Sequence, residues 1–242
     1  MTEKFKTEVK MLKSTNLEEV KEICKILFLS VPIKPLIADI CSHPFTNSII
    51  VPNMTSKNIE NYLDLTKKDD YKKWKESTFK RIDNFNNAES IFYFTNKPYR
   101  LTLFKYCNEY LNLHDFSEIL KYCWITSENP NDDINVSINE LIRYFRKADK
   151  HILMNEEEYK IWEELPDEFI IYRGISNHHN PKGLSWTENK NVAEWFMNRW
   201  KNPDNYLLQA TVKKEDCLCY FNESNEDEIV VDSRHIKSKR ID

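Results

Sequence analysis

The chain is nearly free of glycine. Gly174 and Gly183 are the two glycines among 242 residues, whereas average usage is about 7%. A glycine-rich loop of the G-x-G-x-x-G or Walker type is therefore excluded as a means of holding phosphates. Both glycines fall in one short stretch of the second half, and we expect the rest of the chain to be organised around that stretch.

Long hydrophobic runs are also missing. No stretch reaches the roughly 18 apolar residues that a membrane span requires, and residues 1–6 lead into alternating charges without the apolar segment of a signal peptide. We therefore expect a cytosolic (cytoplasmic) protein with no membrane partner. The net charge of −4 gives no general attraction for nucleic acid, although it leaves room for a local basic patch.

Metal-binding spacings are absent as well. The cysteines form no C-x-x-C pair and have no histidine at ligand spacing, which is typical of buried thiols in a chain without a secretion signal. We therefore predict no catalytic metal. The six cysteines are Cys24, Cys41, Cys107, Cys123, Cys217 and Cys219.

The first half of the chain is predicted to be helical. Thr15 to Glu18 has capping-box spacing before an apolar stripe of helical period, which Pro32 ends. Further helices are expected over 56–82 with a break near 67–70, over 99–112 and over 115–123, whereas 36–54 is ambiguous and could hold a short strand. We take residues 1–114 as a helical N-terminal region.

A polar loop over 124–133 then leads into a second capping box. Ser137 and Glu140 predict the start of a helix that runs to about Ala148, and a short helix follows over 156–164. The Asn, Asp and Pro residues of the loop are typical of a turn. The alternative is a loop that closes over a ligand.

From Phe169 onward the hydrophobic period changes from 3.6 to 2. Residues 169–175 predict a strand in which Arg173 is the single charge, so that burial requires an anionic partner. That partner is either a neighbouring carboxylate or a bound phosphate, which a guanidinium fits in bidentate fashion.

The segment after Gly183 predicts a short strand followed by a helix. Ser185 and Thr187 would share one face of the strand, with Trp186 on the other. The helix over 191–200 would turn an apolar stripe inward, and that stripe consists of Val192, Trp195, Phe196 and Trp200.

Three more strands are predicted over 206–212, 217–221 and 227–231, and their short connections favour an antiparallel or mixed sheet. The last strand is expected to open with Glu226 and Glu228 on the same face, about 7 Å apart. The tail over 234–240 and His235 are interpreted as solvated charge, with phosphate contact as the alternative. His178 and His179 are interpreted as part of a turn.

The order of these strands resembles the mono-ADP-ribosyltransferases of the arginine, serine, glutamate type. That family carries an aromatic-Arg-Gly, a Ser-Thr-Ser and a Glu-x-Glu motif on successive strands, here Tyr172 to Gly174, Ser185 to Thr187 and Glu226 to Glu228. Trp186 departs from the middle position. The resemblance covers roughly 115–242 and implies an α+β protein in which a helical region precedes an ADP-ribosyltransferase-like mixed or antiparallel core of two packed sheets with flanking helices.

The resemblance also implies roles for these residues, with NAD as the substrate. Glu228 would bind the ribose 2′-hydroxyl and stabilise the oxocarbenium-like transition state, Ser185 would orient Glu228 or the ribose, and Glu226 would position or deprotonate the acceptor. The dinucleotide would be held by Tyr172, Arg173, Gly174, Ser185 and Thr187, with Arg173 on the phosphates and Gly174 at the carboxamide.

The acceptor is the least defined part of this expectation. The Glu-x-Glu form of the family often goes with guanidinium acceptors, so a protein arginine is the first expectation and a guanine base in nucleic acid the second. An NAD glycohydrolase and a non-catalytic binding module are the further alternatives. The use of the family in toxins and in phage or defence effectors implies a partner that inhibits the activity.

Overall fold

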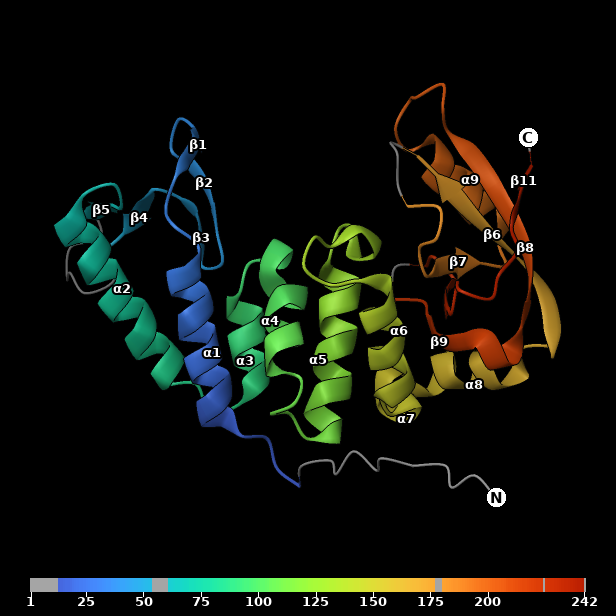
Figure 1. Ribbon diagram of the computed structural model, residues 1–242, viewed down its shortest axis with the longest axis horizontal. Coiled ribbons are helices and arrows are strands. Elements are labelled where there is room, and N and C mark those ends of the chain that lie inside the picture. Colours follow the sequence, from blue (N-terminus) through green and yellow to red (C-terminus); the bar gives the residue numbers. More distant parts are fainter. Residues whose placement is uncertain (1–12, 54–60, 177–179, 224, 242) are drawn as a thin grey trace, which may run out of the picture. The chain divides into compact units, whose positions relative to one another are not determined.

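The computed structural model describes residues 13–53, 61–176, 180–223 and 225–241. The chain divides into two compact units, Met1–Ser127 and Glu128–Asp242, which are coloured blue to green and yellow to red in Figure 1. The boundary that we expected after residue 114 falls inside a helix of the first unit, Leu113–Thr126. Among the described residues, no helix is both long and apolar enough to cross a membrane.

The first unit is mainly helical, as predicted. Its α-helices are α1 (Leu17–Ser30), α2 (Lys68–Asp83), α3 (Ala88–Phe94), α4 (Arg100–Cys107) and α5 (Leu113–Thr126). Asn16 rather than Thr15 caps α1, and Asn112 caps α5, which begins at Leu113 rather than at 115; each asparagine side chain accepts a backbone N–H of the first turn. The hydroxyl of Thr15 instead donates to the carboxylate of Asp115 at 2.5 Å.

The ambiguous segment of the first unit is built from short antiparallel strands. A three-stranded sheet and a two-stranded sheet replace the single short strand that we allowed for, and the helix expected over 56–82 begins only at Lys68. Residues 54–60 lie outside the described part of the chain. The strands are β1 (Pro35–Ile37), β2 (Ile40–His43), β3 (Thr46–Ser48), β4 (Ile50–Pro52) and β5 (Tyr62–Asp64).

The strands of the first unit border an aromatic core around Phe28. Phe28 and Trp74 lie with ring centroids 4.7 Å apart, and Val51 and Leu63 from the two-stranded sheet pack on the same cluster. The fully buried His43 lies against this cluster, where its Nδ1 accepts from the N–H of Phe45 and its Nε2 lies 3.1 Å from the carbonyl of Phe28. The histidine is therefore held as a neutral ring.

Helices flank the sheet of the second unit. They are α6 (Ile138–Lys147), α7 (Lys150–Leu153), α8 (Glu156–Glu164) and α9 (Lys190–Asn198). The predicted capping box of α6 is confirmed, since Ser137 and Glu140 bond reciprocally. A second capping box, between Asn155 and Glu158, starts α8.

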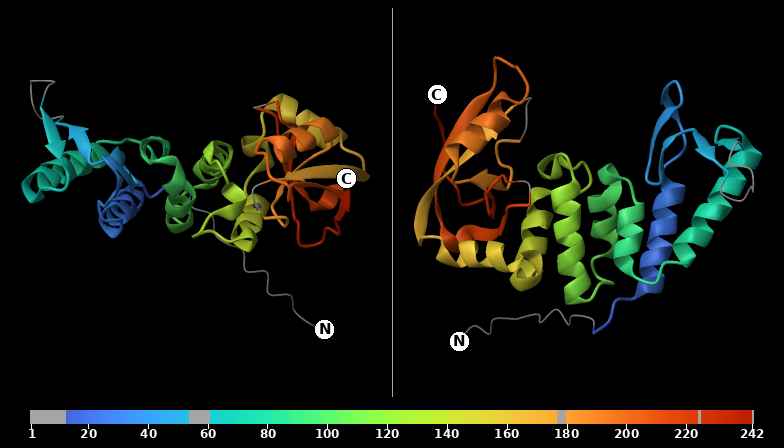
Figure 2. Two further views of the ribbon diagram at one scale, coloured as in Figure 1. Left: turned by 90° about the horizontal axis from the view of Figure 1, so that it is seen from above. Right: turned by 180° about the vertical axis from the view of Figure 1, so that it is seen from behind.

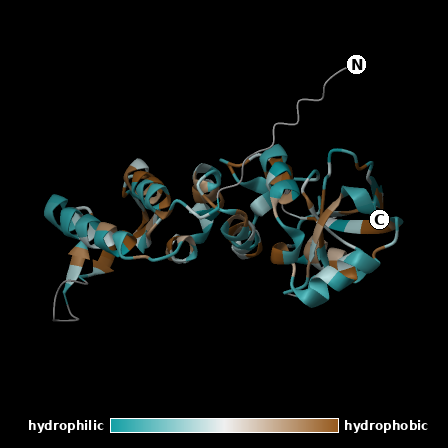
Figure 3. Ribbon diagram, turned by 90° about the horizontal axis from the view of Figure 1, so that it is seen from below, coloured by the Kyte–Doolittle hydropathy of each residue, from teal (hydrophilic) through white to brown (hydrophobic). Residues whose placement is uncertain are grey.

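The strands of this unit form one antiparallel sheet with the order β11-β8-β6-β7-β10-β9. They are β6 (Glu168–Ile175), β7 (Ser185–Thr187), β8 (Tyr206–Lys213), β9 (Cys217–Phe221), β10 (Glu228–Val231) and β11 (Lys239–Ile241). Figure 2 shows them from two further directions, and Figure 3 shows apolar residues concentrated in the strands at the centre of this unit. The protein is therefore α+β, as the sequence predicted.

We expected two packed sheets in this unit, but the structure has one. All six strands belong to one sheet, but its halves, β11-β8-β6 and β7-β10-β9, are joined by one register pair, Tyr172 with Thr187. Strand β11 was expected to be a solvated tail. Its lysine and arginine are tolerated because it is an edge strand, where charged side chains reach water and discourage further pairing.

The helix expected over 191–200 is present as α9, and Val192 and Phe196 are half-buried, but the inward orientation expected for the two tryptophans was wrong. Trp195 and Trp200 are 56% and 57% exposed, and Ala193 is the buried residue of the helix. A Cβ on Gly174 would lie 2.1 Å from the carbonyl oxygen of Ala193 and 2.5 Å from the amide nitrogen of Met197. The backbone of α9 thus rests directly on β6, which leaves no room for large rings between them and turns the tryptophans outward.

Candidate functional site

The three motifs lie on three neighbouring strands. β6, β7 and β10 are adjacent in the sheet although the motifs are far apart in the sequence. Tyr172 pairs with Thr187, and Thr187 pairs in turn with Glu228. Because directly paired residues of an antiparallel ladder project from the same face, these three side chains form one row across the sheet.

The hydroxyls of the second motif share the face of Glu228. Ser185 pairs with Val230 and Thr187 with Glu228, whereas Trp186 points to the opposite, buried face with 3% exposure. The indole Nε1 of Trp186 donates to the carbonyl of Gly183 at 3.0 Å. Trp186, the residue that departs from the Ser-Thr-Ser motif, is therefore a core residue, as the alternation of side chains along the strand predicted. The hydroxyl of Thr187 accepts the N–H of Asn189 and thereby shapes the turn into α9.

Arg173 crosses the narrow junction between β6 and β7. Its side chain is buried, with Nη1 donating to the carbonyl of Ser185 at 2.6 Å and Nη2 to that of Asn180 at 3.2 Å. Burial lowers the pKa of Arg173 to about 10, opposed by the nearby carboxylates of Asp132 and Glu228. Within the described residues, its buried Nε has no hydrogen-bond partner.

Gly183 makes room for this guanidinium. A Cβ at position 183 would lie 2.2 Å from Nη2 of Arg173 and 3.0 Å from Cγ of Asn131. The positions of the two glycines thus have a structural explanation, because Gly174 accommodates α9 and Gly183 accommodates Arg173.

Asn131, from the polar loop before α6, is a residue that the sequence did not single out. Its Oδ1 accepts the N–H of Leu184 at 2.6 Å, and its Nδ2 donates to Oγ of Ser185 at 2.9 Å. Asn131 lies in a short 3-10 turn, Pro130–Asp132. The loop therefore orients β7, which carries Ser185. This role of Asn131 depends on a contact between residues 54 positions apart in the sequence, so local sequence pattern does not indicate it.

The glutamate motif differs from its prediction. Strand β10 begins at Glu228, and Asp227 has φ 47°, so Glu226 precedes the strand and the alternation that would place it beside Glu228 is broken. Both glutamates are half-buried. Burial raises the pKa of Glu226, and the positive charge of Arg199 opposes that rise.

Hydrogen bonds from buried and half-buried side chains hold the turn before β10. The hydroxyl of Tyr220 donates to Asp227 at 2.8 Å, and Oδ1 of Asn222 accepts the N–H of Asp227 at 3.2 Å. The N–H of Asn222 donates to the buried carboxylate of Glu158, which belongs to the capping box of α8. The position of the glutamate motif is thus set by β9 and α8.

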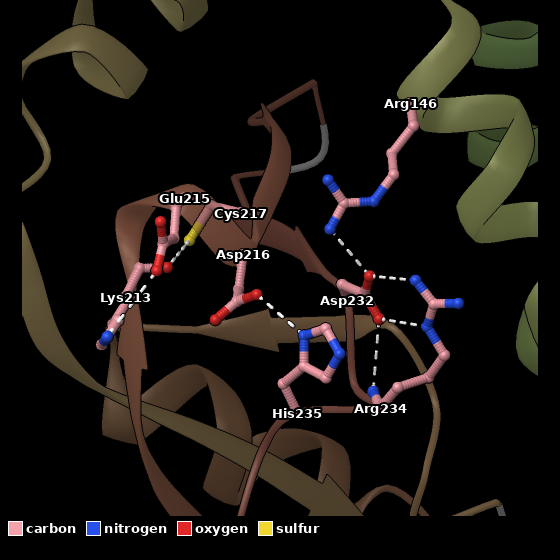
Figure 4. A network of polar contacts seen from close by, with 8 residues as sticks. All are labelled: Arg146, Lys213, Glu215, Asp216, Cys217, Asp232, Arg234 and His235. Atoms are coloured by element: carbon pink, nitrogen blue, oxygen red, sulfur yellow. Dashed lines mark hydrogen bonds and ion pairs between the residues drawn. The ribbon is translucent and has the colours of Figure 1, made fainter. Parts of the chain in front are cut away.

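The other end of β10 is anchored by the fully buried Asp232. Figure 4 shows two guanidinium groups meeting its carboxylate, Arg146 from α6 at 2.8 Å and Arg234 at 2.6 Å. These hydrogen bonds, foremost those of Arg234, lower the pKa of Asp232 despite its burial. Arg234 thus belongs to an ion-pair network rather than to a solvated tail.

The described part of this unit has no cluster of metal ligands, and a hollow found in it does not include the motif residues. Among the described residues, no three His, Cys, Asp or Glu side chains lie close enough to hold a metal ion. A shallow hollow of about 240 Å³ beside α7 and α8 contains none of the motif residues. It is lined by His151, Met154, Asn155, Glu156, Tyr159, Lys160 and Glu163.

The structure brings together four of the predicted site residues, since Tyr172, Ser185, Thr187 and Glu228 share one face of the sheet. Arg173 projects from the opposite face of β6, Gly174 lies against α9, and Glu226 precedes β10. The turn expected at His178 and His179 lies outside the described residues. No protein-family profile, curated protein or solved structure matches this chain.

Proposed function

We propose that the second unit is a mono-ADP-ribosyltransferase that cleaves NAD between nicotinamide and ribose and transfers ADP-ribose to a macromolecule. The observation that carries this proposal is the row of Tyr172, Thr187 and Glu228 across three adjacent strands. Each member of the row belongs to one of the three motifs, so the fold brings together what the sequence keeps apart.

The chemistry suits a site with one essential carboxylate. Nicotinamide leaves NAD as a neutral pyridine, so the leaving group needs no proton, whereas an ordinary glycoside requires a second carboxyl as acid. Glu228 is the half-buried carboxylate on the hydroxyl face. It would bind the ribose 2′-hydroxyl and stabilise the positive charge that develops on the sugar.

The neighbouring residues would position the reactants. Ser185, fixed by Asn131, would present its hydroxyl to the ribose, and Glu226, whose raised pKa makes it a stronger base, would take a proton from the acceptor. Arg173 is a positioning residue in this conformation, because Asn180 and Ser185 occupy its Nη groups. A phosphate bound by these Nη groups would have to compete with the carbonyls of Asn180 and Ser185.

The resemblance favours an arginine side chain of a protein as acceptor and a toxin or defence effector as the biological setting. In that setting the activity would be held in check by an inhibitor partner. Water as acceptor would make the protein an NAD glycohydrolase on the same site.

The test measures nicotinamide release by the full chain from NAD that is labelled in its ADP-ribose part, with and without cell lysate. The same experiment follows where the label goes. Glu228→Gln is expected to abolish release, whereas Glu188→Gln, an exposed carboxylate just after β7, is expected to retain it. Label on a macromolecule supports transfer, and free ADP-ribose supports hydrolysis. Absence of release in all conditions, together with no rise in melting temperature on adding NAD, would refute the proposal and leave a binding module.

A further inference from the structure

The loop that carries Glu226 has an unusual backbone conformation. Strands β9 and β10 are antiparallel neighbours, and residues 222–227 form the loop between them. Three non-glycine residues have a positive φ in the described part of the chain, and two of them, Asn225 (φ 55°) and Asp227 (φ 47°), lie directly before and after Glu226. Asn and Asp adopt this left-handed conformation more readily than other side chains, but at a cost in energy. The loop therefore keeps its shape because its surroundings hold it.

Hydrogen bonds hold both residues that flank Glu226. The phenol of Tyr220 donates to Oδ1 of Asp227 at 2.8 Å, and the N–H of Asp227 donates to Oδ1 of Asn222 at 3.2 Å. On the other side of Glu226, the N–H of Asn225 donates to the carbonyl of Asn222 at 3.1 Å. Asn222 thus binds one flanking residue through its side chain and the other through its backbone.

Asn222 is fixed in turn by a buried carboxylate of α8. Glu158 is 2% exposed, and its Oε1 accepts the N–H of Asn222 at 2.9 Å. Its Oε2 accepts the N–H of Asn155 at 2.9 Å, which is one half of the capping box of α8. Figure 1 shows β9 beside this helix. Because a buried carboxylate is tolerated only where its oxygens accept hydrogen bonds, the link to Asn222 helps to keep Glu158 in place.

A loop that served only to connect two strands would not need this arrangement. Glycine at position 225 or 227 would adopt the same φ without steric cost, whereas the chain has its two glycines at Gly174 and Gly183. A loop without glycine has fewer conformations available to it. Strain of this kind gathers at functional sites, where it fixes the position of a reactive group. The residue whose position is fixed here is Glu226.

We propose that Tyr220, Asn222 and Glu158 are positioning residues that hold Glu226 against the acceptor and thereby set how much ADP-ribose is transferred rather than lost to water. This inference rests on the proposed function and deepens it, because it names the residues on which transfer depends.

The chemistry explains why position matters more for transfer than for hydrolysis. The bond between nicotinamide and the anomeric carbon of the ribose breaks with its electron pair going to nicotinamide. A lone pair of the acceptor forms the new bond to that carbon, and the acceptor's proton passes to the carboxylate of Glu226. Water can react from many orientations, whereas a side chain of a macromolecule reacts only when the base lies at its nucleophile. Displacement of Glu226 therefore lowers transfer more than hydrolysis.

The test follows two products of one reaction. The full chain is given NAD labelled in its ADP-ribose part together with cell lysate, and the label on macromolecules is divided by the nicotinamide released. Loss of folded protein lowers both quantities and leaves this ratio unchanged. Tyr220→Phe, which removes one hydroxyl, and Asn222→Ala, which removes one acceptor, are each expected to lower the ratio roughly ten- to a hundred-fold, as for a catalytic group displaced by about 1 Å. Glu226→Gln sets the lower limit.

Glu158→Gln tests the link to α8. A glutamine has one acceptor oxygen where the carboxylate uses two, so Asn155 or Asn222 loses its partner and the ratio is expected to fall. Matched controls on the same helix are Glu157→Gln, at an exposed carboxylate, and Tyr159→Phe, at a phenol that lines the hollow beside α7 and α8. Both controls are expected to give the ratio of the unaltered chain.

The outcomes separate this inference from the proposed function. No nicotinamide release by the unaltered chain would refute both. Release without label on any macromolecule would overturn the inference but leave NAD cleavage, with water as the acceptor. An unchanged ratio in both Tyr220→Phe and Asn222→Ala, or an equal fall in the control variants, would overturn the positioning role while transfer itself stands.

Discussion

Gly183 and Arg173 are in such close contact that a methyl group on the glycine would lie 2.2 Å from Nη2 and 2.7 Å from Cζ of the arginine. Gly183→Ala is therefore expected to displace the guanidinium from Asn180 and Ser185 and to lower the free energy of unfolding by about 1–3 kcal/mol, as overpacking does. Urea unfolding measures this loss, and nicotinamide release should fall with it.

A double-mutant cycle identifies the cause of that loss. If the clash is with the guanidinium, Gly183→Ala costs less in an Arg173→Lys background, because lysine has no fork at that position. If Gly183→Ala lowers the free energy of unfolding equally in both backgrounds, the steric clash is instead with Asn131, whose Cγ would lie 3.0 Å from the new methyl group.

Asn131→Ala is expected to loosen the serine strand. The change removes an acceptor from the N–H of Leu184 and a donor from the hydroxyl of Ser185, which corresponds to about 1–3 kcal/mol of stability. Nicotinamide release should fall by more than stability alone explains, because Ser185 loses its orientation. Asn129→Ala, at an exposed asparagine of the same loop whose side chain caps nothing, serves as the control, and similar losses in both variants would contradict this role of Asn131.

Asp232→Asn is expected to destabilise the second unit at neutral pH by about 1–3 kcal/mol, since it removes the charge that Arg146 and Arg234 share. The folded state lowers the pKa of Asp232. Its contribution is therefore present above the unfolded pKa of about 3.9 and is lost as pH falls below that value. Urea unfolding at neutral pH and at low pH should show the two proteins converging under acid.

Asp216→Asn is the matched control for Asp232. Asp216 contacts the exposed ring of His235 at 3.2 Å, a surface pair that contributes little. If Asp216→Asn lowers the free energy of unfolding as much as Asp232→Asn does, the effect is not specific to the buried ion-pair network of Asp232.

The first unit is expected to lose stability between pH 6.5 and pH 4. Burial lowers the pKa of His43 to about 4, so the neutral ring stabilises the fold above the unfolded pKa of about 6.5, and up to about 3 kcal/mol is lost as pH falls towards 4. Urea unfolding across this range should show a slope that His43→Gln removes. His114→Gln, at an exposed histidine, should retain the slope, and a slope retained by His43→Gln would assign it to other groups.

The sequence predicted the elements that local pattern defines. The capping box at Ser137, the period-2 strand around Arg173 and the inward Trp186 were all found. The short connections between strands predicted an antiparallel or mixed sheet, and the sheet is antiparallel. Each of these depends on residues within a few positions of one another.

The remaining features depend on contacts that local pattern does not encode. The left-handed Asp227 moved Glu226 off the strand, and no glycine marked that turn in the sequence. The packing of α9 on Gly174 turned Trp195 outward, against the helical period. The role of Asn131 arises from a partner in a distant strand, and β11 is too short and too charged for its pairing with β8 to be foreseen.

The sheet is weakest between β6 and β7, where one register pair joins the two strands. We expect strands to separate first where the fewest hydrogen bonds join them. That junction lies between the first motif, on β6, and the other two motifs, on β7 and β10. The side-chain bond from Arg173 to the carbonyl of Ser185 spans the same seam. Partial unfolding at this junction would thus divide the candidate site while both halves of the sheet persist, so the proposed NAD cleavage would be lost before the secondary structure.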